Sequence, residues 1–139
     1  MNGMLNNGGT KMKSFMDELK NNKIVVLDSI PKNNAIGFLK RQLKKDYPDL
    51  YFEVRTADDI YFSMDKLKNT MQDMDILILE ATQLPEERMK EINEIAKGLN
   101  VGVIVLMAKT IPMYMQFNSD YAIYDFVSIT EMQAAYEGN

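Results

Sequence analysis

Three short stretches of the chain are dominated by consecutive apolar residues, and polar segments separate them. They cover residues 23–27, 76–79 and 101–107. An apolar run of this kind is typical of a strand that is buried on both faces of a parallel sheet. Residues 51–55 instead alternate apolar and charged side chains, which predicts a strand near a sheet edge, and residues 122–127 are predicted to form the last strand.

Between these strands, apolar residues recur three or four positions apart, which is the spacing of one buried helix face. Three helices are indicated in this way, by Ile36, Leu39 and Leu43, by Met64, Leu67 and Met71, and by Met89, Ile92, Ile95 and Ala96. Pro85 predicts the start of the third helix and Gly98 its end. Residues 111–120 are weakly patterned and predict a short or distorted helix. A final helix is expected to run to about Tyr136, after a capping-box pattern that begins at Ser128.

Strands and helices therefore alternate along the chain, which predicts an α/β domain with a parallel sheet and helices on both faces. Five strands at this length fit the three-layer flavodoxin-like arrangement with strand order 2-1-3-4-5. The domain is expected over residues 23–139, behind a leader of residues 1–22 that contains a short helix at residues 14–20. Ligands of such sheets bind at the carboxyl ends of the strands, here near the switch point between strands 1 and 3.

The composition of the 139 residues removes several classes of function. The chain contains no Cys, which excludes thiol catalysis and thiolate metal sites, and no His, which excludes a Ser-His-Asp triad and imidazole ligation. A net charge of −4 argues against direct binding of nucleic acid. No apolar run is long enough to cross a membrane and no signal peptide is recognisable, so the chain is expected to be cytoplasmic and away from the membrane.

Polar side chains follow three of the predicted strands. Asp28 follows the first, Glu80 the third and Lys109 the fourth. With strands 1 and 3 as neighbours, Asp28 and Glu80 are expected to face each other, and this pair could hold Mg²⁺ through its oxygens. Alternatively, Lys109 could neutralise Glu80, or all three could be solvated loop residues. The pattern leaves these interpretations open. No cofactor is expected, and Mg²⁺ on the two carboxylates is the alternative.

Over residues 23–136 this layout resembles the receiver domain of bacterial two-component response regulators. Asp28 matches one acid of the pair that follows strand 1 in the family, and Glu80 stands where the family has its phosphoaccepting Asp. Met107 stands where the family has Thr or Ser, and Ser128 stands where it has Lys. The resemblance implies a degenerate phosphoacceptor-like site made of these four residues, with Lys109 close by.

The departures from the family pattern remove the groups that handle phosphate. Glu80 is one methylene longer than Asp, Met107 cannot donate a hydrogen bond and Ser128 carries no charge. The resemblance therefore implies a pseudo-receiver, a non-catalytic signalling or regulatory module that acts through protein–protein interaction. One alternative is a phosphoaccepting receiver with Mg²⁺ on Asp28 and Glu80. Another is a small flavodoxin-like ligand-binding protein or phosphatase-type enzyme.

In receivers, the surface of the fourth helix, fifth strand and fifth helix is the usual dimer or output face. The aromatic residues that map to this region are Tyr114, Phe117, Tyr121, Tyr124 and Tyr136. They are therefore the expected contact surface for a partner protein or for a second copy of the chain in a homodimer. Residues 113–117 are also rich in methionine, which either fills the core or provides an adaptable contact surface.

A basic run at residues 40–45 falls on the outside of the first predicted helix of the domain. It is interpreted as a solvated helix face. A docking patch for an acidic partner is the alternative interpretation.

Overall fold

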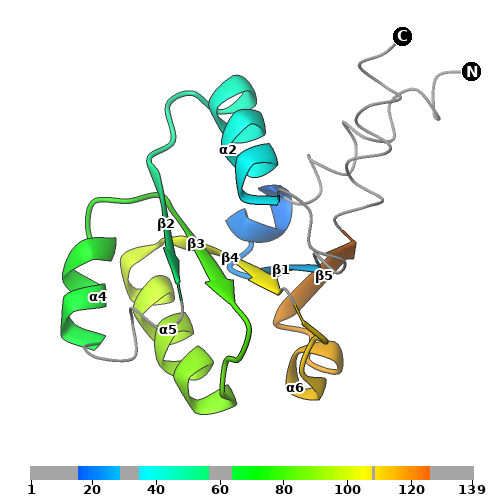
Figure 1. Cartoon of the computed structure of the whole chain (residues 1–139). Helices are drawn as coiled ribbons and strands as arrows, with labels where there is room; N and C mark the ends of the chain where they lie inside the picture. The colour runs from blue at the N-terminus through cyan, green and yellow to red at the C-terminus, as the bar shows by residue number, and fades with distance from the viewer. Residues whose placement is uncertain (1–15, 29–34, 57–63, 108, 126–139) are drawn as a thin grey trace, which may run out of the picture.

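The computed structural model describes residues 16–28, 35–56, 64–107 and 109–125, which contain one five-stranded sheet (Figure 1). Its strands are β1 (Ile24–Asp28), β2 (Phe52–Thr56), β3 (Ile76–Ala81), β4 (Gly102–Met107) and β5 (Tyr121–Asp125). Every neighbouring pair of strands runs parallel. The three apolar runs form the interior strands β1, β3 and β4, whereas the partly exposed strands β2 and β5 form the two edges.

Helices cover both faces of this sheet. On one face lie α2 (Ala35–Asp46) and a short helix at residues 16–20, and on the other lie α4 (Met64–Met71), α5 (Glu86–Leu99) and α6 (Met113–Gln116) (Figure 1). The predicted three-layer α/β class and its all-parallel sheet are thereby confirmed.

Two apolar clusters fill the spaces between these layers. Alternate residues of β1 take part in different clusters, because successive side chains of a strand point to opposite faces. Val25 and Leu27 pack under α2 together with Leu39, whereas Val26 packs under α5 with Met89. A strand that is buried on both sides needs an unbroken apolar sequence, which is the pattern of residues 24–27.

The strands are ordered β2-β3-β4-β1-β5, so the predicted order 2-1-3-4-5 is wrong. β1 lies between β4 and β5 instead of between β2 and β3. Both orders place β2 and β5 at the edges and the three apolar runs inside. Because the interior strands are almost equally buried, the hydrophobic pattern identifies the set of interior strands but does not rank their positions.

The helix ends agree with the pattern in most places. The weakly patterned residues 111–120 contain the one-turn helix α6. Gly98, where the sequence predicts a stop, lies inside α5, which continues to Leu99. The cap is Asn100 in the left-handed conformation, with φ of 59° and ψ of 46°. Asn tolerates this conformation better than most residues with a side chain, so it ends the helix in place of glycine.

Residues 16–20 are part of the packed structure. The structure has a short helix at residues 16–20, and its Met16 and Leu19 are buried in the cluster under α2. The first 15 residues, Ser128 and the final helix expected to reach Tyr136 lie outside the described residues. Within the described part, no helix combines the length and the apolar character that a bilayer crossing needs.

Candidate functional site

Asp28 and Glu80 lie apart at the carboxyl edge of the sheet. β4 lies between the strands that carry them, and two strand spacings amount to roughly 10 Å. They also belong to opposite faces of the sheet, because residues two apart on a strand share a face. Asp28 shares the face of Val26, on the α5 side, whereas Glu80 shares the face of Ile78, on the α2 side. The prediction that these two carboxylates face each other is therefore wrong.

The strand order moves the switch point of the sheet to β1 and β4. The connection after β1 leads to β2 through α2 on one face, whereas the connection after β4 leads to β5 through α6 on the other face. Ligands of open α/β sheets bind outside the carboxyl ends of two such strands. The described strand ends at this place are Asp28, Met107 and Asp125, which are in register with one another.

Asp28 and Asp125 are the two acids that the fold does bring together. They end neighbouring strands in register. Asp125 is on the same face of β5 as Tyr121, which packs on the same side of the sheet as Val26, so both acids belong to the α5 side. Of the described residues at this edge, this pair could contribute oxygen ligands to a cation such as Mg²⁺. No group of three or more acidic side chains within the described residues is arranged to hold a metal ion.

The other residues of the predicted phosphoacceptor-like site do not place a hydroxyl or a cation beside Asp28 and Asp125 within the described part of the chain. Met107 is only 1% exposed and packs in the cluster under α5 and α6, so a thioether stands where a hydroxyl would be needed. Lys109 lies beyond the end of β4 and is exposed, and Ser128 lies outside the described residues.

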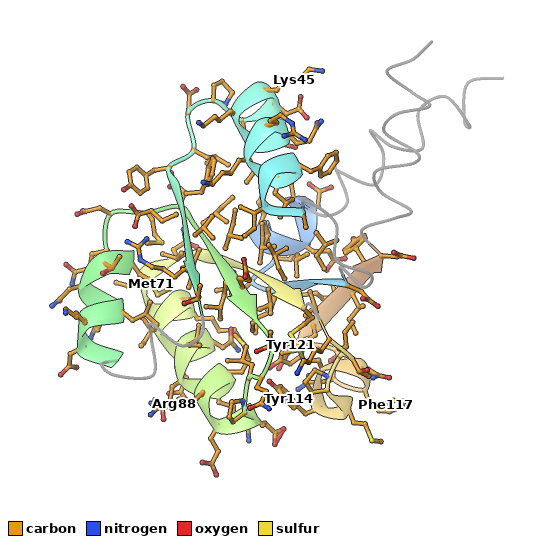
Figure 2. The ribbon with its side chains drawn as sticks, viewed as in Figure 1. Lys45, Met71, Arg88, Tyr114, Phe117 and Tyr121 are labelled. Carbon is orange, nitrogen blue, oxygen red and sulfur yellow. The ribbon has the colours of Figure 1, made fainter. Side chains whose placement is uncertain are left out.

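Tyr114 and Tyr121 hold α6 against the rest of the fold. The Tyr114 hydroxyl donates a hydrogen bond to the backbone carbonyl of Leu84, just before α5. Its ring meets the Tyr121 ring edge to face, with centroids 5.9 Å apart (Figure 2). Burial, together with the carboxylates of Glu86 and Asp120, raises the pKa of Tyr121 to about 12. Both tyrosines are partly buried and act as anchors, not as exposed contact residues.

Phe117 has the exposure expected of a contact residue. It is 80% exposed, and Met113, one helical turn earlier, is 71% exposed. Met115 lies between them in sequence and is fully buried, so α6 presents one apolar pair outward while its opposite side enters the core. Met113 and Phe117 are called the α6 patch below. The sequence left open whether the methionines of residues 113–117 fill the core or form a contact surface. The i, i+4 spacing of Met113 from Phe117 is the signal that could have placed Met113 beside it.

The five aromatic residues predicted to form one contact face are divided by the sheet. Tyr124 packs against the cluster under α2, on the face opposite Tyr121. Burial and the carboxylates of Glu18 and Asp17 raise the pKa of Tyr124. Tyr136 lies outside the described residues. Among the predicted residues that the structure describes, Phe117 is the one with a largely exposed side chain.

Comparison with known proteins shows a distant structural likeness. No protein-family model matches the sequence, and no curated protein matches it. Among solved structures, the chain is similar to AMPPCP-bound DnaA from Aquifex aeolicus, with 14% sequence identity and a TM-score of 0.46. The likeness covers 93% of this chain and 44% of that protein, so the chain spans less than half of its length.

Proposed function

We propose that this chain is a non-catalytic interaction domain that binds a partner protein through the α6 patch. The observation that carries the proposal is the exposure of Met113 and Phe117, at 71% and 80%, at the start of α6 and at its C-cap. Large apolar side chains in contact with water raise the free energy of the unbound protein, and their burial in a partner pocket releases that cost.

The α6 patch is held in place before any partner arrives. Met115 is buried in the core, and the Tyr114 hydroxyl is bonded to the Leu84 carbonyl. The Gln116 side-chain amide donates to the backbone carbonyl of Ile111 at 2.6 Å, and the Phe117 N–H donates to the carbonyl of Met113 at 3.3 Å. Little conformational entropy of the backbone is then lost on binding, which favours affinity from a small contact.

The size of the α6 patch favours a transient contact over a stable homodimer. A large aromatic side chain buries roughly 150–250 Å². One aromatic residue and one methionine therefore offer well under the area of about 800 Å² per partner that stable complexes use. The occupant that fits is an apolar pocket on another protein that accepts both side chains.

The carboxyl edge supports the same proposal over the phosphoacceptor alternative. Asp28 and Glu80 lie on opposite faces with β4 between them, and the residue in register with Asp28 is the buried Met107. A phosphoryl group at Asp28 would meet the Asp125 carboxylate on the neighbouring strand. A carboxylate on the neighbouring strand is an unfavourable neighbour for a further anion.

The test is a comparison of binding by three forms of the full chain. The wild type, the double variant Met113→Ser with Phe117→Ser, and a control variant Tyr51→Ser are used to capture proteins from the source cells. Tyr51 is 51% exposed but lies beside β2, at the other edge of the sheet. The captured candidate is then purified, and its Kd for each form is measured by calorimetry.

We expect a protein whose Kd rises at least tenfold for the double variant and stays within twofold for the control. Light scattering is expected to give the mass of one chain for the isolated wild type. The proposal is wrong if every captured protein binds the double variant as tightly as the wild type. It is also wrong if the α6 patch proves to be buried in a stable homodimer.

A further inference from the structure

A groove runs along the outer side of β2, between this edge strand and α2. It has a volume of about 500 Å³ and is bordered by Lys40 and Lys44 of α2 and by the β2 region from Leu50 to Arg55. β2 is one edge strand of the sheet and β5, next to α6, is the other (Figure 1). The groove is therefore separate from the α6 patch.

The outer edge of β2 can accept another strand. Within the described sheet, β2 pairs with β3 alone. The Tyr51 carbonyl accepts hydrogen bonds from the N–H groups of Asp75 and Ile76, so the backbone of Tyr51 faces β3. Backbone polar groups alternate sides along a strand, so those of Phe52 and Val54 face outward. An outward-facing row of this kind is the template that strand addition uses.

One outward group of β2 already has a partner within the chain. The Arg55 guanidinium donates to the Val54 carbonyl at 3.1 Å and is paired with the Glu53 carboxylate. The Tyr51 hydroxyl donates to the other oxygen of Glu53 at 2.7 Å. These contacts hold Glu53 and Arg55 together as an ion pair at the border of the groove, and Lys40 and Lys44 are the other charged residues that line it.

The two lysines form a basic border on an acidic protein. Lys40 and Lys44 are exposed and lie one helical turn apart on the same side of α2, while the whole chain has a net charge of −4. Below them, Leu50, Phe52 and Val54 are half-buried and pack against the cluster under α2. The groove thus has an apolar floor with cationic groups above it, which complements an anionic segment with some apolar side chains.

The spacing of the lysines matches an extended chain. Residues four apart on a helix are separated by about 6 Å along its axis. Residues two apart on a strand point to the same face and are separated by about 6.6 Å. A strand added beside β2 would therefore bring side chains at every second position to Lys40 and Lys44 in turn.

We infer that this groove binds an extended segment of a partner protein that carries acidic residues at alternate positions. The segment pairs with the outer edge of β2 at Phe52 and Val54. Its carboxylates meet the Lys40 and Lys44 ammonium groups, and its backbone supplies the hydrogen bonds. The two lysines select for charge, and the strand edge selects for an extended backbone.

The probe for the test is a short fluorescein-labelled peptide of alternating glutamate and valine, and its binding to the full chain is followed by anisotropy. Two further peptides have the same length: one has glutamine in place of glutamate, and the other has the same composition with the glutamates in one block. The protein variants are Lys40→Gln with Lys44→Gln, and the matched control Arg41→Gln with Lys45→Gln. Both variants remove two positive charges from exposed positions of α2, but on different sides of the helix.

We expect the alternating peptide to bind the wild type, and to bind the Lys40/Lys44 variant about tenfold more weakly, since each exposed ion pair contributes a few-fold. The control variant should stay within about twofold of the wild type. The glutamine and block peptides should bind at least tenfold more weakly. Hydrogen exchange should show slower exchange of the Phe52 and Val54 amides in the complex.

The following results would overturn the inference. The first is no detectable binding of the alternating peptide. The second is equal weakening by the two charge variants, which would indicate a general response to charge. The third is equal binding of the block peptide, or tighter binding of a single-stranded oligonucleotide with the same dependence on Lys40 and Lys44, which would indicate a site for polyanions instead of a strand.

Discussion

The hydroxyl of Tyr114 on α6 donates to the backbone carbonyl of Leu84, thirty residues earlier in the chain. This bond joins the helix that carries the α6 patch to the segment between β3 and α5. The two segments are distant in sequence, so the bond fixes the position of α6 against the core. The exposure of Met113 and Phe117 depends on that position.

Replacing Tyr114 by Phe should destabilise the fold, because the Leu84 carbonyl loses its hydroxyl donor in a partly buried place. We expect a loss of about 1 kcal/mol in the free energy of unfolding, measured by urea denaturation. The control is Tyr51→Phe, which removes a hydroxyl bond to Glu53 from an exposed site and should cost less than about 0.5 kcal/mol. Equal losses in the two variants would contradict the anchoring role of Tyr114.

The stability of the protein should fall as the pH rises from about 10 to about 12. Burial, with Glu86 and Asp120 nearby, raises the pKa of Tyr121 to about 12 in the folded protein, against 10.0 for an exposed tyrosine. Above pH 10 the unfolded chain releases this proton while the folded chain keeps it, so each step in pH favours unfolding. The contribution is complete below pH 10 and is lost as the pH passes through 12.

Tyr121→Phe should therefore make the alkaline decline of stability less steep than in the wild type. The measurement is the melting temperature at a series of pH values from 8 to 12. Some decline should remain, because the pKa values of Tyr47, Tyr51 and Tyr124 are also raised. A decline of unchanged steepness in Tyr121→Phe would show that Tyr121 is not the group responsible.

Two substitutions near the end of α5 should change stability in opposite directions. Gly98 lies inside the helix with open space around its Cα, so Gly98→Ala should stabilise the protein by about 0.5–1 kcal/mol. Asn100 has a φ of 59°, so Asn100→Ala should destabilise it by about 1 kcal/mol. Asn100→Gly is the control and should be neutral or slightly stabilising, because glycine adopts positive φ freely. Destabilisation by Gly98→Ala would mean that α5 ends where the sequence alone predicts.

The strand order can be tested by double-mutant cycles on three acids at the carboxyl edge. Asp28→Asn and Glu80→Gln should have additive effects on the free energy of unfolding, within about 0.5 kcal/mol, because β4 separates the two residues. Asp28→Asn and Asp125→Asn should be coupled by more than that, because these carboxylates end neighbouring strands in register. A larger coupling energy for the first pair than for the second would favour the order 2-1-3-4-5.

Much of the fold was predictable from the sequence, because burial leaves a direct record in residue type. The unbroken apolar runs mark the interior strands, and the alternation at Phe52–Thr56 marks an edge strand. The same record does not distinguish among β1, β3 and β4, since their residues are equally apolar on both faces. The prediction that Asp28 faces Glu80 depended on the order of these interior strands, so it is wrong because the predicted order is wrong.

The contact surface was predicted in part for a related reason. Aromatic residues were selected by type, yet a tyrosine can use its ring in the core and its hydroxyl as an anchor, as Tyr114 does. The sequence did not decide whether the methionines of residues 113–117 lie in the core or on the surface. The structure has one of each in a single turn. Met115 is fully buried, whereas Met113 is 71% exposed. The direction of a four-residue helix is set by its tertiary bonds, which sequence spacing does not specify.

The central claim is that Phe117 enters a pocket on a partner protein, and photocrosslinking inside the source cells tests it most directly. A benzophenone side chain replaces Phe117 in one form of the protein and the exposed Glu94 of α5 in another. We predict a discrete crosslinked species for position 117 that is missing for position 94. Absence of a crosslinked species at position 117, or the same species from both positions, would contradict the claim.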